Sequence, residues 1–124
     1  SNWLRMPSTC HHDHPRLMEL ADEFLAKPNF SWSRPKLFYL WGHSYEFEAN
    51  NNWHVIEEFA AKVSGKEDIW YATNIEICDY VNAWKRMITS ADGTRVFNPN
   101  SCPIWLWADG KTYQVDPGCQ ITLD

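Results

Sequence analysis

The sequence predicts an α/β fold in which parallel strands are joined by crossover helices, followed by a small antiparallel β appendage at the C-terminus. An apolar run at residues 37–41 has the character of a buried strand, and stretches before and after it repeat apolar residues at helical spacing. Alternating helices and strands are typical of parallel sheets. We predict an α/β part at residues 1–90 and an appendage at residues 91–124, packed together as one structural unit.

The N-terminal third is predicted to be a loop, a helix and a second loop. Residues 1–14 show no periodicity. The helix is expected to begin near Pro15, with Asp13 as its cap, and to end before Pro28. Residues 28–36 contain two prolines and lead, as a loop, into the strand.

Two further helices are predicted after the strand. An asparagine at 51–52 is in place to cap the first of them, and Gly65 is a suitable stop. Residues 68–72 are predicted to form a short strand. Thr73 and Glu76 have the spacing of a capping box, which predicts the start of the last helix.

Near Ser90 the pattern changes to short strands separated by turn dipeptides. Asp109-Gly110 lies between two short runs rich in apolar residues, which is a strong signal for a two-residue hairpin. The strands predicted in this region are 94–98, 104–108, 111–115 and 120–123.

The charge and the hydropathy of the chain argue against several classes of partner. The net charge of -5 and the absence of a Lys/Arg cluster argue against nucleic acid or an anionic membrane as a partner. No apolar run approaches the roughly 20 residues needed to cross a bilayer.

The four cysteines form no C-x-x-C pair, so we expect reduced thiols in a cytoplasmic protein.

His43 is the leading catalytic candidate because it follows the apolar strand directly. The C-terminal ends of strands are where α/β proteins bind ligands. An imidazole exchanges protons near neutral pH, so His43 is predicted to act as general acid or base, with Glu46 near enough to orient it. The alternatives are a hydrogen-bonded structural His43 and an ordinary solvated carboxylate at Glu46.

A second candidate is the histidine-rich segment around residue 12. His11, His12 and His14 are candidate zinc ligands. Neighbouring loop histidines are usually not all ligands, and no carboxylate completes a site by spacing, so the spacing alone assigns no metal ligand. Trp41 and Tyr45, together with Trp105 and Trp107, are either a stacking platform for sugar rings or core residues, and the core interpretation is favoured.

Three blocks in order along the chain resemble the C-terminal portion of bacterial polysaccharide deacetylases. They are PSTCHHDHPRLMELADEF, LFYLWGHSYEFEANNNW and DIWYATNIEICDYVNAW, and together they cover most of the chain. The resemblance implies part of a distorted (β/α) barrel and removal of N- or O-acetyl groups from carbohydrate. In that family an Asp and two His hold a divalent metal, often zinc. By the same comparison His43 protonates the leaving group, and His11 or His12 lines the substrate pocket.

The chain departs from the family in its metal-binding motifs. It has no Asp-Asp pair, and its histidines around Pro15 are one residue short of the family's His-[Ser/Thr]-x-x-His spacing. We therefore expect a C-terminal piece of a longer deacetylase, with no metal bound to this chain alone. Such a piece should self-associate or bind its missing N-terminal half. The alternative function is a non-catalytic carbohydrate-binding or scaffold domain.

Overall fold

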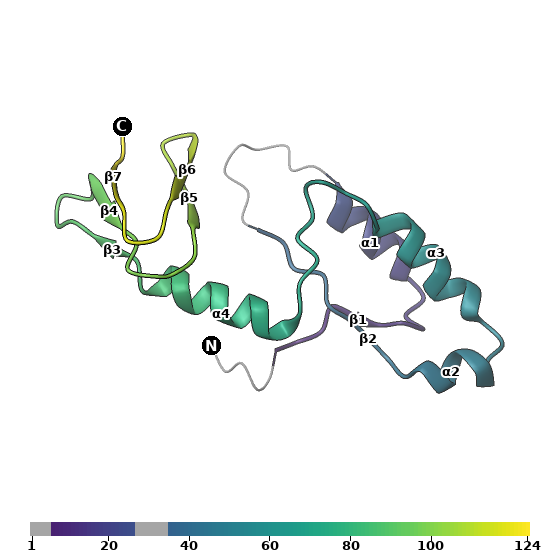
Figure 1. Ribbon diagram of the computed structural model, residues 1–124. Helices are drawn as coiled ribbons and strands as arrows, with labels where there is room; N and C mark the ends of the chain where they lie inside the picture. The colour runs from purple at the N-terminus through teal and green to yellow at the C-terminus, as the bar shows by residue number, and fades with distance from the viewer. Residues whose placement is uncertain (1–5, 27–34) are drawn as a thin grey trace. The chain divides into compact units, whose positions relative to one another are not determined.

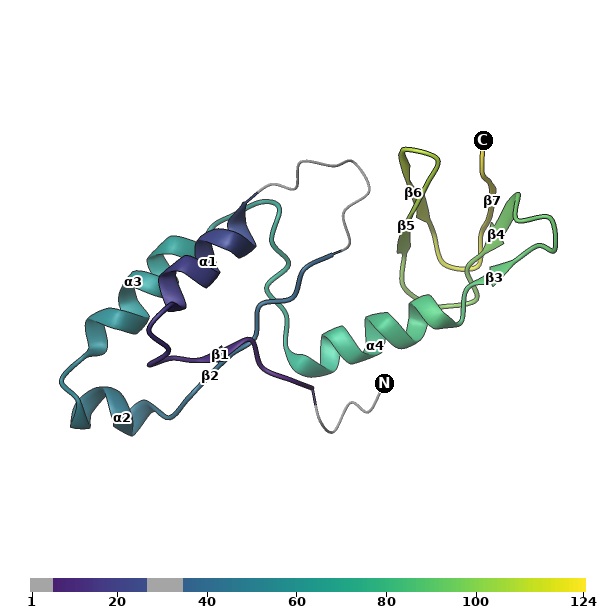
Figure 2. The ribbon, with the colours of Figure 1, turned by 180° about the vertical axis from the view of Figure 1, so that it is seen from behind.

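The computed structural model describes residues 6–26 and 35–124. The chain divides into two compact units, Ser1–Trp70 and Tyr71–Asp124. The first unit contains a β–α–β arrangement followed by two helices, and the second contains one helix followed by short antiparallel strands (Figures 1 and 2).

The first unit begins with two short strands that run parallel. Cys10 lies opposite Leu40 and His11 lies opposite Trp41. A helix lies between the two strands in sequence, as expected for a crossover connection. The elements are β1 (Cys10–His11), α1 (Leu17–Leu25), β2 (Leu40–Trp41), α2 (Ser44–Ala49) and α3 (Trp53–Val63).

Helix α1 packs against α3 in both ribbon views (Figures 1 and 2). Leu17 and Ala21 form the buried face of α1, as its helical spacing predicts. The ring of Phe38, just before β2, contacts Phe24 of α1 at 5.6 Å and Phe59 of α3 at 5.3 Å between centroids. The segment that leads into β2 is therefore held by both helices.

Lys36 holds the same segment to the end of α1. Its Nζ donates hydrogen bonds to the carbonyls of Glu23 at 2.8 Å and Ala26 at 2.9 Å. The last carbonyls of a helix lack partners within the helix and carry partial negative charge, so a lysine there is stabilising. Phe38 and Lys36 together fix where β2 begins.

The second unit consists of α4 and two small antiparallel sheets. One sheet has the strand order β3-β4-β7, and the other is the β5–β6 hairpin. Asp109 and Gly110 connect the hairpin with φ of 48° and 83°, which is the sign pattern of a type I′ turn. The elements are α4 (Asn74–Lys85), β3 (Ile88–Thr89), β4 (Arg95–Phe97), β5 (Ile104–Ala108), β6 (Lys111–Val115) and β7 (Gln120–Thr122).

Asn98 occupies the centre of the second unit, where it is fully buried. Its Nδ2 donates to the carbonyls of Cys102 at 2.9 Å and Val115 at 2.8 Å. Its Oδ1 accepts from the backbone N–H of Asn100 at 3.0 Å. A buried amide with its donors and acceptor satisfied fixes the positions of the segments around it.

Asn100 extends this network to α4. Its Nδ2 donates to the carbonyl of Ala83 at 2.8 Å, and its Oδ1 accepts from Nε of Arg86 at 2.8 Å. The C-terminal end of α4 is thereby tied to the segment that precedes the hairpin. The hairpin also contacts the helix directly, since the backbone N–H of Trp105 donates to the hydroxyl of Tyr80 at 3.1 Å.

The sequence predictions for helices and C-terminal strands are confirmed in large part. The capping box of α4 is present: Thr73 N–H donates to Glu76 Oε2 at 2.7 Å, and Glu76 N–H donates to Thr73 Oγ1 at 3.4 Å. The hairpin at 104–108 and 111–115 has the predicted bounds. The coarse class, α/β with antiparallel C-terminal strands, is also confirmed.

Other predictions are wrong. Residues 68–72 form no strand, and the parallel partner of β2 is instead β1, in a segment predicted to be a loop. Only two residues of the predicted strand at 37–41 pair as β2. Helix α2 (Ser44–Ala49) was not among the predicted helices. Within the part of the chain that the structure describes, β1 and β2 are the only parallel strands and no barrel closes.

Two general expectations can be compared with the described residues. None of the helices at 6–26 or 35–124 has the length and apolar character needed to span a membrane. All four cysteines are unpaired thiols. Burial of Cys10 beside the candidate site raises the pKa of its thiol.

Candidate functional site

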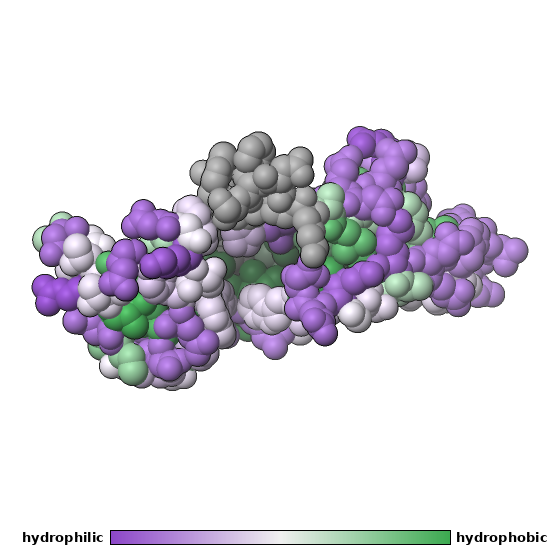
Figure 3. Space-filling view, turned by 90° about the horizontal axis from the view of Figure 1, so that it is seen from above, coloured by the Kyte–Doolittle hydropathy of each residue, from purple (hydrophilic) through white to green (hydrophobic). Residues whose placement is uncertain are grey.

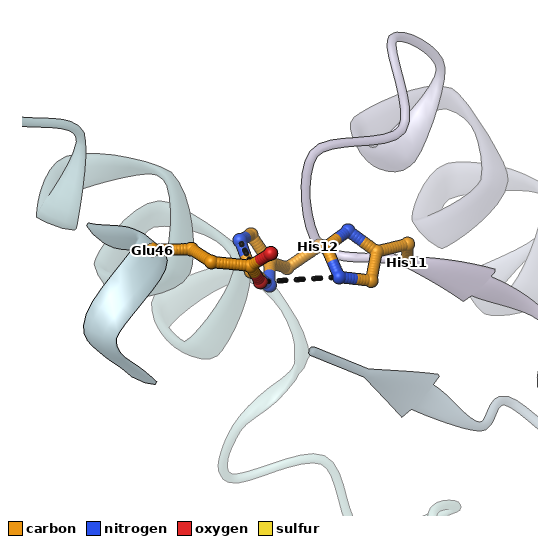
Figure 4. Close-up of side chains that lie close together, drawn as sticks. All are labelled: His11, His12 and Glu46. Carbon is orange, nitrogen blue, oxygen red and sulfur yellow. Dashed lines mark ion pairs between the residues drawn. The ribbon is translucent and has the colours of Figure 1, made fainter. Parts of the chain in front are cut away.

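Three side chains from two distant segments meet at the C-terminal ends of β1 and β2 (Figure 4). Nε2 of His11 lies 3.2 Å from Oε2 of Glu46, and Nε2 of His12 lies 3.6 Å from the same oxygen. We call His11, His12 and Glu46 the His–Glu cluster. One ligand atom from each of its residues lies within 4.8 Å of the others.

The two histidines are positioned by the pairing of β1 with β2. His11 is the last residue of β1, opposite Trp41, and the backbone N–H of His12 donates to the carbonyl of Trp41 at 3.0 Å. Parallel strands place their carboxyl ends at the same edge, so both histidines reach the edge from which α2 begins. This edge is where the sequence placed the catalytic candidate.

Glu46 enters the cluster from the first turn of α2. Its Oε2 also accepts a hydrogen bond from the backbone N–H of His43 at 3.1 Å. An acidic side chain in this position satisfies a free N–H at the start of the helix and interacts favourably with the helix dipole. The carboxylate is therefore held toward His11 and His12 by the same bond that starts α2.

Asp13 anchors the other side of His11. Its Oδ1 accepts a hydrogen bond from Nδ1 of His11. That bond, with smaller contributions from the charges of His11 and His12, holds the pKa of Asp13 below its usual range. Asp13 was predicted to cap α1, but it orients His11 instead.

His12 is the buried member of the cluster, with 2% of its surface exposed. Its ring packs against Phe47 of α2, with centroids 4.2 Å apart and the ring planes tilted by 36°. Its Nδ1 lies so near Gly42 that a Cβ at residue 42 would be 1.8 Å away. Neither ring nitrogen has a hydrogen-bond partner among the described residues.

His43 lies on the exposed side of the site, between two aromatic residues. Its ring stacks on Tyr45 at 5.2 Å and meets the edge of Trp41 at 6.0 Å, while Trp41 contacts His11 at 4.5 Å. Trp41 is 48% exposed and Tyr45 is 67% exposed. The predicted site residues 41, 43 and 45 thus form an accessible row of rings that leads from the His–Glu cluster to solvent.

The remaining predicted residues lie outside this row. His14 is exposed, and its Nδ1 accepts the backbone N–H of Arg16 at 3.1 Å. Trp105 and Trp107 belong to the second unit and reach its surface on one face of β5. The interaction of Glu46 with His43 is through the His43 backbone N–H, whereas its ionic contacts are with His11 and His12.

Sequence reasoning missed the partnership of Glu46 with His11 and His12. It also missed the contact between Asp13 and His11. The signal that could have found the first is a short strand at Cys10–His11: once paired with β2, it brings the two histidines to the edge that carries Glu46. A carboxylate with two imidazoles can exchange protons or coordinate a divalent metal.

Comparison of the chain with protein-family models, with curated proteins and with solved structures found no match.

Proposed function

We propose that this chain is part of a carbohydrate deacetylase, a hydrolase that removes N- or O-acetyl groups from sugars. The observation that carries the proposal is the exposed His43, flanked by Trp41 and Tyr45 and set beside the His–Glu cluster at the carboxyl ends of two parallel strands. The resemblance of three ordered sequence blocks to polysaccharide deacetylases supports the same reaction, and with it a (β/α) barrel as the parent fold.

In this proposal His43 is the general acid. When the acetyl group leaves, the departing sugar amine or alkoxide needs a proton, and an accessible imidazole supplies one near neutral pH. His43 is exposed and its backbone N–H is bonded to Glu46. The main chain is therefore held in place while the exposed ring, between Trp41 and Tyr45, can be reached by a substrate.

Trp41 and Tyr45 are proposed to bind the sugar. Flat aromatic side chains that reach solvent offer apolar surface to the C–H faces of a sugar ring. The hydroxyl of Tyr45 can also form a hydrogen bond with the sugar. Both lie in ring contact with His43. A sugar on either ring would bring its acetyl group near the proposed acid.

By the resemblance, the reaction also uses a divalent metal, often zinc, which polarises the acetyl carbonyl and lowers the pKa of the attacking water. The family holds this metal with an Asp and two His. Within the described residues, the group with matching chemistry is the His–Glu cluster. The buried ring of His12, with both nitrogens unpartnered there, is the observation that fits a metal ligand.

The exposed apolar side chains support association with a further protein surface. Ile75, Trp84 and Ile88 are each more than half exposed. On the face in Figure 3, hydrophobic residues (green) reach the surface between hydrophilic ones (purple). Exposed apolar surface of this kind favours association, and we propose self-association or binding to an N-terminal half of the parent enzyme.

The proposal is tested with the deacetylase that contains this chain, by measuring acetate release from acetylated chitooligosaccharides. His43→Ala is expected to lower kcat by about 10²–10⁴-fold, as for loss of a general acid. His54→Ala is the matched control, because His54 is an exposed histidine of α3 outside the row of rings; its activity should not change.

Near-normal turnover in His43→Ala would remove His43 from the mechanism. If the wild-type protein binds the oligosaccharide but releases no acetate, the alternative is favoured: a non-catalytic carbohydrate-binding domain that uses the same rings. Loss of binding in Trp41→Ala and Tyr45→Ala would then locate that surface.

A further inference from the structure

Two of the three donor separations in the His–Glu cluster match those of ligands around one cation. In a tetrahedral zinc site with bonds of about 2.0–2.1 Å, neighbouring donors are about 3.3–3.4 Å apart. The observed separations from Oε2 of Glu46 are 3.2 Å to His11 and 3.6 Å to His12. The third pair, the ring nitrogens of His11 and His12, lies within 4.8 Å.

The hydrogen bond between His11 and Asp13 sets which nitrogen of His11 faces the cluster. When Nδ1 donates to Asp13 in the neutral ring, Nε2 carries a lone pair and points it at Glu46. A lone pair and a carboxylate oxygen at this distance repel unless a proton or a metal cation lies between them. A carboxylate behind a histidine is also the usual outer partner of a metal ligand, because it fixes the ring and raises its basicity.

His12 gives independent support. A buried imidazole whose nitrogens lack partners loses the hydrogen bonds it made with water. Gly42 occupies the space at its Nδ1, which leaves Nε2, directed at Glu46, as the nitrogen able to gain a partner. A cation in the cluster would satisfy this atom.

Hydrogen bonds to the backbone hold the residues of the His–Glu cluster in place even when no metal is bound. The N–H of His12 is bonded to the carbonyl of Trp41, and Glu46 is bonded to the N–H of His43. The two bonds fix the donors on neighbouring elements that meet at one sheet edge. His11 and Glu46 remain partly exposed, so the side opposite His12 is open to solvent.

Against the expectation from the missing family motifs that this chain alone binds no metal, we propose that His11, His12 and Glu46 bind one divalent cation of the zinc class, through the two Nε2 atoms and Oε2, with a fourth position open to water or another ligand. Two imidazole donors favour zinc over magnesium or calcium, which prefer oxygen donors. Three protein ligands with an open position are typical of catalytic zinc sites. This site does not depend on the deacetylase proposal, because it concerns metal binding by the chain itself.

The test uses the purified, tag-free chain after chelator treatment. Zinc binding is followed by calorimetry, and cobalt, as a spectroscopic substitute, by visible absorption. We expect one equivalent of either metal and the intense absorption of four-coordinate cobalt. Magnesium added in excess should not displace it.

Two variants make the test specific. Glu46→Gln can keep the bond from the His43 N–H but removes the charge, so zinc affinity should fall at least 100-fold. Asp13→Asn alters only the partner of His11 and should weaken zinc binding by about 10–100-fold. The matched control Glu57→Gln, at an exposed position of α3, should bind as the wild type does.

Circular dichroism establishes whether each variant is folded. If Glu46→Gln does not fold, Asp13→Asn still decides the test. The proposal is overturned if the folded wild-type chain fails to bind one equivalent of zinc. It is also overturned if wild type and a folded Glu46→Gln or Asp13→Asn bind zinc equally well.

Discussion

The side chains of Asn98 and Asn100 are bonded directly to each other, with Nδ2 of Asn100 donating to Oδ1 of Asn98 at 2.8 Å. Both residues are buried. Through them the end of α4, the loop after β4 and the last residue of β6 share one hydrogen-bond network. Polar side chains therefore organise the centre of the second unit together with the fully buried Ile104 and Val115.

Removing Asn98 should destabilise the second unit strongly. Asn98→Ala removes the partner of the Cys102 and Val115 carbonyls and of the Asn100 backbone N–H in a buried site. We expect the free energy of unfolding to fall by about 2–4 kcal/mol. Urea denaturation measures it, and Gln120→Ala, at an exposed position of β7, is the control with an expected change below about 0.5 kcal/mol.

Two substitutions on β5 should differ in their effect on stability, because one is on its buried face and the other on its exposed face. Ile104 is fully buried, whereas Trp107 is 48% exposed. Ile104→Ala is expected to cost about 2–5 kcal/mol, as for other buried large-to-small changes, and Trp107→Ala clearly less. Thermal melts of the two variants decide this. A larger loss for Trp107→Ala would mean that the Trp face is covered in solution.

Gly42→Ala should disrupt the His–Glu cluster by displacing the ring of His12. A Cβ at residue 42 would lie 1.8 Å from Nδ1 of His12, so the ring would have to move. We expect a loss of about 1–3 kcal/mol from overpacking and a shift of the His12 resonances in NMR spectra. Gly65→Ala adds a Cβ that meets nothing within 4 Å, so it should leave those resonances unchanged, although its φ of 66° carries its own strain.

The capping box of α4 should make helix stability depend on pH. Hydrogen bonds from the Thr73 backbone and hydroxyl lower the pKa of Glu76 from its ordinary value of 4.5. A lowered pKa in the folded state means that this stabilisation is present above pH 4.5 and is lost as pH falls through the folded-state pKa. Glu76→Gln should therefore lose less stability than wild type on acidification. Denaturation at a series of pH values, with Glu67→Gln as an exposed control, checks the difference.

The parts of the fold that were predictable from sequence carry local signals. Thr73 and Glu76 mark a helix start, and Asp109-Gly110 marks a hairpin, because the interactions involved span only a few residues. The two-residue strand β1 has no periodicity to detect. The aromatic run at 68–72 has strand character but no strand beside it to pair with among the described residues, and β-propensity depends on such context.

Only the part of the candidate site formed by His43 and Glu46 could be predicted from the sequence. The position of His43 and Glu46 after an apolar run placed them at a strand end before any pairing was known. Their meeting with His11 and His12 depends on which strand pairs with β2. Strand pairing is a long-range choice that residue spacing does not encode, so spacing places Glu46 beside His43 but does not predict its ion pairs with His11 and His12.

The hairpin turn has a consequence for the order of folding. A two-residue loop closes at little entropic cost, and hairpins form in about 1–10 μs. β4 and β7 pair across the hairpin, with Val96 opposite Ile121. Once β5 and β6 have paired, Ile104 lies beside Val115, so the chain that must be closed to join β4 to β7 is much shorter. We therefore expect the Asp109–Gly110 turn to speed formation of a sheet to which it does not belong, so a substitution that slows the turn should delay that sheet as well.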